Sequence, residues 1–156
     1  MEKSEQVLRF LGEQGIAYRL FTHEPKWTIE DCLMTPGLDP ARATVPRNAF
    51  LCNRQQTEFF LMLLSPRQPF RTAVVSKLLG VSRLSFAPED ALQSLLGVTA
   101  GAVSPLGLLF DEEKRVRLVI DGALLAYASL WFHPCVNTQS VEMATRDFLN
   151  RFLPAL

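Results

Sequence analysis

The segment GAVSPLG, residues 101–107, is the first part of the sequence whose residue types and spacing could do chemistry. Small residues let backbone N–H groups come close to a ligand, and Pro105 fixes the direction in which the chain leaves the loop. Such N–H groups suit a carbonyl oxygen that becomes negative during ester hydrolysis. The phosphate-binding pattern GxxxxGK[ST] is not matched, because no Lys follows Gly107 and we expect no helix to begin there. An ordinary turn is the alternative.

A second candidate lies in the polar segment PRNAFLCNRQQTEF, residues 46–59, where Arg47 and Asn48 stand just before an apolar strand. The Arg47 guanidinium could hold a phosphate or a terminal ribose. The Asn48 amide could donate or accept a hydrogen bond. A pair of solvated side chains at the start of a strand is the alternative.

His133 and Cys135 form a third candidate, since residues two apart on a strand lie on the same face. Pro134 disturbs that geometry, and nothing local marks Cys135 as an activated thiolate. A buried structural cysteine is therefore favoured. For His133 alone, a catalytic role and a purely structural role both stay open.

Metal binding has little support. His23, His133 and the cysteines Cys32, Cys52 and Cys135 are ligand types, but no pair has the spacing C-x-x-C or H-x-x-x-H that is typical of zinc sites. We expect the cysteines to be small core residues in their reduced form, and we predict no metal and no cofactor.

Length and charge narrow the class of protein. A chain of 156 residues predicts a single domain spanning 1–156. Its 16 basic residues balance 16 acidic ones, so extensive nucleic-acid binding is disfavoured while a local basic patch is not excluded. The charged N-terminus does not suit a signal peptide, and no apolar run approaches the ~20 residues that span a membrane. A cytoplasmic protein without membrane contact is expected.

Helices are predicted where apolar residues share one face and turn signals follow. The ranges are 7–14 before Gly15, a short helix after a capping Thr28, 71–79 before Gly80, 88–96 before Gly97, and a last helix capped by Thr145. Strands are predicted at 18–21, 44–52, 57–64, 84–86, 106–110, 115–120 and 127–132. The segment FFLMLL, apolar on both faces, is placed centrally in a sheet. Together these predict an α+β fold with one curved mixed sheet flanked by helices.

Several of these segments, taken in order, resemble the YbaK/prolyl-tRNA-synthetase-associated domain family and, within it, free-standing prolyl-tRNA editing proteins. The matching pieces are LFTHEP (20–25), TIED (28–31), TVPRNAFLCNRQQTEFFLMLLS (44–65), SKLLGVSRLSFA (76–87), GAVSPLGLLFD (101–111) and FHPCVNT (132–138). Each motif alone is weak, but the ordered set covers nearly the whole chain and is specific.

The resemblance implies a trans-acting aminoacyl-tRNA deacylase, which hydrolyses the ester between a wrong amino acid and the 3′-terminal adenosine of tRNA. Relatives most similar in these motifs clear alanine from tRNA(Pro), whereas YbaK-type relatives remove cysteine. The family uses no metal and no covalent nucleophile. Its partners would be the acceptor end of a mischarged tRNA and prolyl-tRNA synthetase.

The resemblance also implies roles for individual residues. The family's G-x-x-x-P loop, a pocket wall beside the scissile ester, corresponds to residues 101–105. The family's Lys-Asn pair corresponds to Arg47 and Asn48, and the His of its F-H-P motif to His133. The predicted catalytic residues are Asn48, Gly101, Ala102, Ser104 and His133, and the predicted substrate-binding residues are Arg47, Val103 and Pro105.

One departure is important. Arg47 keeps the charge of the family lysine, but a guanidinium has a different reach and cannot exchange a proton near neutral pH. If the lysine only anchors tRNA, activity should survive. Three alternatives stay open: a weak or inactive module that binds a tRNA end or a synthetase, a deacylase for cysteine or another small amino acid, and a protein-interaction domain that uses an apolar surface of Phe and Leu residues.

Overall fold

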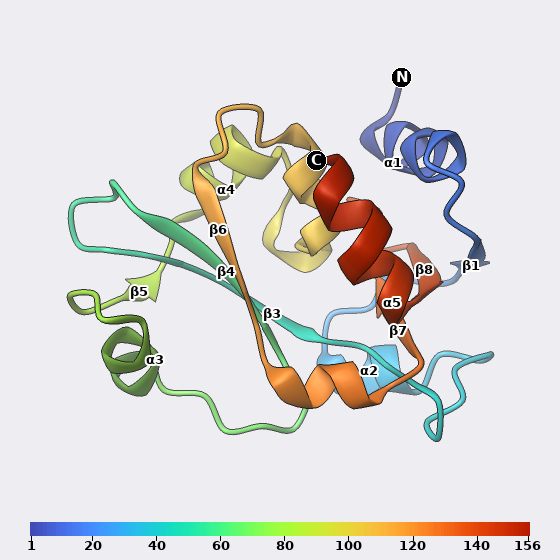
Figure 1. Ribbon diagram of the computed structural model, residues 1–156, viewed down its shortest axis with the longest axis horizontal. Helices are drawn as coiled ribbons and strands as arrows, with labels where there is room; N and C mark the ends of the chain where they lie inside the picture. The colour runs from blue at the N-terminus through green and yellow to red at the C-terminus, as the bar shows by residue number, and fades with distance from the viewer.

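The computed structural model describes residues 1–156 and has the predicted α+β character (Figure 1). The strands are β1 (Tyr18–Thr22), β2 (Ala43–Thr44), β3 (Arg47–Cys52), β4 (Phe59–Leu64), β5 (Ser85–Phe86), β6 (Val116–Ile120), β7 (Ser129–Phe132) and β8 (Gln139–Ala144). The helices are α1 (Lys3–Glu13), α2 (Ile29–Leu33), α3 (Thr72–Leu79), α4 (Glu89–Leu96) and α5 (Thr145–Asp147), which continues as a π-helical turn and a 3-10 turn to Ala155. Further 3-10 helices span Ala100–Ala102, Pro105–Phe110 and Gly122–Ala126.

The strands form two mixed four-stranded sheets, in the orders β1-β8-β7-β2 and β5-β3-β4-β6. Each sheet contains one parallel pair, β2 with β7 and β4 with β6. The chain passes from one sheet to the other between β2 and β3, through Val45 and Pro46. Pro46 has no N–H group and cannot continue the ladder. The predicted curved sheet is therefore divided at this point, where Arg47 and Asn48 begin β3.

Strand β4 is buried along its whole length, which agrees with its predicted central place. Its side chains alternate between two apolar clusters, as the period of two in a strand requires. Phe59, Leu61 and Leu63 join the main core, which also contains residues of α1, α4 and the C-terminal helix. Phe60 and Met62 face a smaller cluster under α3. This two-sided burial fixes the register of β3, whose first residues belong to the candidate site.

Most predicted helix boundaries are found in the structure. The Thr28 hydroxyl accepts from the Asp31 N–H at 3.1 Å and caps α2. Gly80 and Gly97 close α3 and α4 with φ of +67° and +68°, a left-handed conformation that glycine adopts without the strain of a Cβ. Thr145 does not act as the predicted cap. Its hydroxyl instead donates to the Tyr127 carbonyl at 2.6 Å.

The prediction for residues 106–110 was wrong, because this segment is a 3-10 helix and not a strand. Ser104 caps it by accepting from the Leu106 N–H at 3.2 Å, and Pro105 occupies its first turn. A short buried apolar run does not distinguish strand from helix by its pattern. The prediction that no helix begins in residues 101–107 was also wrong, because the same 3-10 helix begins at Pro105. Strand β8 was not predicted.

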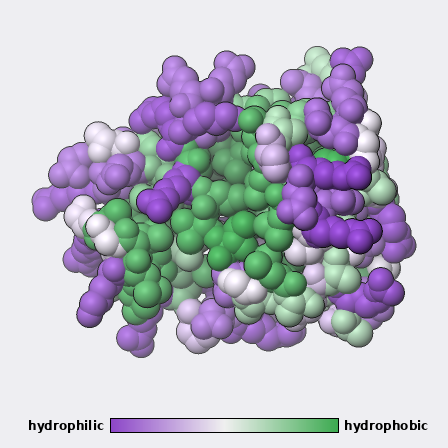
Figure 2. Space-filling view, viewed as in Figure 1, coloured by the Kyte–Doolittle hydropathy of each residue, from purple (hydrophilic) through white to green (hydrophobic).

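Polar and apolar side chains are mixed over the surface, except for one region where apolar side chains gather. Figure 2 shows apolar side chains gathered over the middle of the face shown, over β6 and towards α3. None of the helices combines the length and apolar character needed to cross a membrane. All three cysteines are free, as predicted.

Candidate active site

One small pocket brings together five of the predicted site residues. It has a volume of about 140 Å³ and lies where the start of β3, the end of β7, the segment before α2 and the GAVSPLG loop meet. It is lined by residues 26–29, Cys32, residues 45–48, Ala100, Gly101, Val103 and His133. Arg47, Asn48, Gly101, Val103 and His133 thus converge from distant parts of the chain.

Arg47 and Asn48 reach the pocket because they follow Pro46 at the break between the sheets. The Arg47 guanidinium donates to the Gln68 carbonyl at 3.3 Å. The Asn48 amide nitrogen donates to the Pro46 carbonyl at 3.3 Å. The Asn48 amide oxygen is buried and has no hydrogen-bond partner. A buried acceptor without a partner costs free energy, so this oxygen is suited to receive a donor from a ligand.

His133 follows β7, and its hydrogen bonds fix which ring nitrogen carries the proton. Nδ1 lies 2.8 Å from the Gln139 carbonyl oxygen, and a carbonyl can only accept. The proton of the neutral ring is therefore on Nδ1, and Nε2 is an acceptor. Burial, the largest cause, lowers the pKa of His133 from its ordinary value, with a smaller lowering from nearby His23. His133 therefore presents a neutral acceptor nitrogen at neutral pH.

The GAVSPLG loop is tied directly to His133. The Ser104 hydroxyl donates to the His133 backbone carbonyl at 2.6 Å. The loop residues Val103 and Ser104 are both buried. Gly101 and Val103 line the pocket, so the loop forms one of its walls.

Three predicted residues do not line the pocket. Ala102 is buried in the main core, Ser104 uses its hydroxyl within the loop, and Pro105 starts the following 3-10 helix. Their geometry suits a role in holding the loop and not direct contact with a substrate. Their catalytic or binding roles stay predictions.

Eight of the thirteen lining residues were not predicted as site residues, and two of them, Trp27 and Cys32, have side chains that bear on the chemistry. Trp27 is 73% exposed and lines the pocket. The sequence feature that could have indicated Trp27 is its position directly before the capping residue Thr28. Cys32 lies with its Sγ 3.8 Å from His133 Nε2, and no sequence spacing indicates that pair, because the two residues are brought together only by packing of α2 against β7.

The cysteine–histidine pair does not have the properties of an activated nucleophile. Burial is the largest cause that raises the pKa of Cys32, and the pKa of His133 is lowered. Both shifts favour a neutral thiol beside a neutral imidazole over a thiolate beside an imidazolium. Burial also raises the pKa of Cys135 to about 12, which agrees with its predicted structural role.

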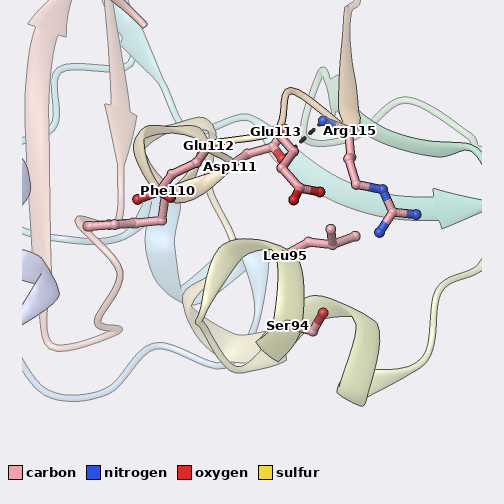
Figure 3. Close-up of a pocket in the computed structure, with 7 residues that line it drawn as sticks. All are labelled: Ser94, Leu95, Phe110, Asp111, Glu112, Glu113 and Arg115. Atoms are coloured by element: carbon pink, nitrogen blue, oxygen red, sulfur yellow. Dashed lines mark hydrogen bonds between the residues drawn. The ribbon is translucent and has the colours of Figure 1, made fainter.

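A second pocket, of about 260 Å³, lies between α4 and the turn before β6 (Figure 3). Its lining includes Asp111, Glu112 and Glu113. The Asp111 carboxylate accepts from the backbone N–H groups of Arg115 and Val116 at 3.1 and 2.8 Å, so it holds the turn. None of the predicted site residues lies here, and the three carboxylates outnumber the one guanidinium of the lining, Arg115, so the charge of this pocket would repel a nucleic acid. The pocket at His133 is therefore the candidate active site.

Comparison with known proteins shows the family to which the chain belongs. The chain is a member of the aminoacyl-tRNA editing domain family, whose model matches residues 23–150. It is 32% identical to the prolyl-tRNA editing protein ProX of Acetoanaerobium sticklandii, over 94% of this chain and 88% of that protein. It is 29% identical to the mouse prolyl-tRNA synthetase associated domain-containing protein 1, over 89% of this chain and 83% of that protein.

A solved structure of a candidate trans-editing enzyme for prolyl tRNA synthetase shares the fold. The TM-score is 0.74 at 15% identity, and the match covers 96% of this chain and 90% of that one.

Proposed function

We propose that the protein is a trans-acting deacylase that hydrolyses mischarged tRNA(Pro), with alanyl-tRNA(Pro) as its substrate. The observation that carries the proposal is the convergence of Arg47, Asn48, Gly101, Val103 and His133 on one pocket in a chain of the aminoacyl-tRNA editing family. The relative named as a prolyl-tRNA editing protein supports tRNA(Pro) as the tRNA.

The aminoacyl group occupies the pocket. A volume of about 140 Å³ is well below the ~300–1,000 Å³ of sites for drug-sized ligands, so only a small group fits. The apolar side chains of Ile29, Val45 and Val103 line it and suit a methyl side chain. The unpartnered Asn48 oxygen accepts from the α-ammonium group or from a ribose hydroxyl of the terminal adenosine.

Hydrolysis is carried out by water. A backbone N–H of the GAVSPLG loop donates to the ester carbonyl oxygen, which becomes negative when water adds to the carbonyl carbon. His133 Nε2, as a neutral acceptor, exchanges its weak contact with the Cys32 thiol, at 3.8 Å, for the water or the terminal 2′-hydroxyl that assists it. Collapse of the tetrahedral intermediate breaks the ester bond, and a proton passes to the leaving 3′-oxygen. The products are free alanine and a tRNA with its 3′-hydroxyl restored.

The tRNA end is held by positive charge near the pocket. Arg47 lies on the pocket lining and contacts the 65–71 loop through Gln68. Residues 59–88 contain four basic side chains and no acidic one. All four are exposed and none forms a salt bridge. They are Arg67, Arg71, Lys77 and Arg83. A stretch of chain with exposed basic and no acidic side chains supports binding of a phosphate backbone despite the zero net charge of the chain.

Selectivity against proline requires a steric wall, because one methylene changes binding by only about 1–3 kcal/mol in a simple pocket. The buried Val45 and Val103 side chains supply that wall. Prolyl-tRNA synthetase is a proposed partner, supported by the name of the mouse relative. We further propose that the protein acts in the cytoplasm, which suits its three free cysteines.

The test is release of alanine from alanyl-tRNA(Pro) by the wild type, by Asn48→Ala and by Gln55→Ala, an exposed control on the β3–β4 loop. We expect turnover by the wild type and the control. Asn48→Ala should be slower by about 10- to 100-fold, because the lost hydrogen bond is to a charged or reacting group. Absence of release by the wild type would contradict the proposed function.

A further inference from the structure

Trp27 is a large aromatic side chain on the lining of the candidate active site that nothing in the core requires. Its side chain is 73% exposed, whereas Trp131, the other tryptophan, is 1% exposed and stacks on Phe21 with ring centroids 4.3 Å apart. An exposed tryptophan gains little from folding, so its place on a functional pocket calls for a ligand.

The backbone on both sides of Trp27 is fixed. The Lys26 N–H donates to the Asn137 carbonyl at 3.3 Å, and Thr28 caps α2. The indole lies directly against Gly101, because a Cβ at position 101 would come within 2.7 Å of its Cζ3 atom. The ring is therefore held beside the GAVSPLG loop with most of its surface open to solvent.

We propose that Trp27 is the stacking platform for the 3′-terminal adenine of the substrate. This inference rests on the proposed function. A pocket of about 140 Å³ cannot hold an aminoacyl group and an adenosine together. The base must lie outside the pocket, on its rim. Arg47 provides the positive charge for the phosphate on the same lining, and Trp27 provides an aromatic face for the base.

The competing interpretation is that Trp27 is an apolar lid over the amino acid. The two differ in what can replace the indole. A lid needs apolar bulk, so leucine should serve. A stacking platform needs a flat aromatic face, so phenylalanine should serve in part and leucine should not.

A binding measurement that needs no turnover tests contact with the base. The trinucleotide CCA is titrated against the wild type and against Trp27→Phe, with intrinsic tryptophan fluorescence as the signal and the dinucleotide CC as the control ligand. We expect CCA to change the fluorescence of the wild type more than CC does. We expect no change in Trp27→Phe, whose remaining tryptophan is buried. An equal response in the two proteins would overturn the inference.

A kinetic measurement separates stacking from a lid. Deacylation of alanyl-tRNA(Pro) is compared for the wild type, Trp27→Phe, Trp27→Leu and Trp27→Ala, with Phe86→Ala, an aromatic outside the pocket that is 63% exposed, as the matched control. Stacking predicts that KM rises roughly 5- to 150-fold in the Ala and Leu variants with a small change in kcat, and less in the Phe variant. Wild-type kinetics in Trp27→Leu or Trp27→Ala would overturn the inference while leaving the proposed function intact. A wild type that binds CCA at Trp27 but releases no alanine would refute the proposed function and keep the adenine site.

Discussion

Replacing Gly101 with alanine adds one methyl group at the contact between the GAVSPLG loop and Trp27. A Cβ at this position would lie 2.7 Å from Trp27 Cζ3, 3.1 Å from Cε3 and 3.3 Å from Asn137 Nδ2. Carbon atoms do not approach to 2.7 Å, so something must move. The indole is an exposed side chain, and it moves more easily than the loop, which Ser104 ties to His133.

The size of the effect follows from this geometry. The indole must shift by about 1 Å to restore ordinary contact, and a misplacement of that size near reacting atoms can lower a rate by up to about 10²-fold. We expect kcat/KM for alanyl-tRNA(Pro) to fall roughly 10- to 100-fold. Stability should change by no more than about 1 kcal/mol, because Gly101 does not have a positive φ and alanine fits its backbone.

A double-mutant cycle with Trp27→Ala provides the assay. Without the indole, the new methyl group has no clash with it, so Gly101→Ala should cost little more activity in the Trp27→Ala background. Single-turnover deacylation of alanyl-tRNA(Pro) gives kcat/KM for the four proteins, and thermal unfolding checks that each is folded. Fully multiplicative losses would refute the reasoning, since they would mean that Gly101 acts without Trp27.

Three further predictions concern the chemistry of the pocket and its surroundings. The rate of hydrolysis by Cys32→Ala should stay within about 10-fold of the wild-type rate, because Cys32 is a neutral thiol and not the nucleophile. A loss of more than about 10³-fold, or a trapped acyl-enzyme, would contradict this prediction. Because burial lowers the pKa of His133 from 6.5, the acid limb of kcat/KM should have its inflection below pH 6.5, where the acceptor nitrogen becomes protonated. This limb should be missing in His133→Gln, and an inflection above pH 6.5 in the wild type would refute the assignment. The double variant Arg71→Gln, Lys77→Gln should bind tRNA more weakly and with a smaller salt dependence, measured by filter binding from low to moderate salt. The control double variant Glu112→Gln, Glu113→Gln should not bind more weakly. An unchanged salt slope in the Arg71, Lys77 variant would show that these basic side chains do not contact the tRNA.

Much of the fold could be predicted because local signals and burial agree. Gly80 and Gly97 end their helices in the left-handed conformation, which glycine adopts more readily than other residues. The apolar run of β4 is buried on both sides because it separates two clusters. Residues 106–110 could not be assigned in this way, since a short buried apolar run fits a strand and a 3-10 helix equally. The Ser104 hydroxyl, which accepts from the Leu106 N–H, stabilises the 3-10 helix.

Only the site residues that lie inside sequence motifs could be predicted. Arg47, Asn48, Gly101 and His133 were named from segments that keep their order along the chain, and the structure places all four on one pocket. The contact of Cys32 with His133 joins residues 101 positions apart and has no local signature. The role of Ser104 is also tertiary, because its hydroxyl acceptor is the His133 carbonyl.

The most direct test of the account is deacylation of alanyl-, cysteinyl- and prolyl-tRNA(Pro), measured in parallel for the wild type and Arg47→Lys. We predict that the wild type removes alanine rapidly and spares proline, which would show that arginine suffices in place of the family lysine. Turnover by Arg47→Lys alone would mean that this chain keeps the pocket without the chemistry. No turnover by either protein would contradict the proposed function and favour a module that only binds the tRNA end.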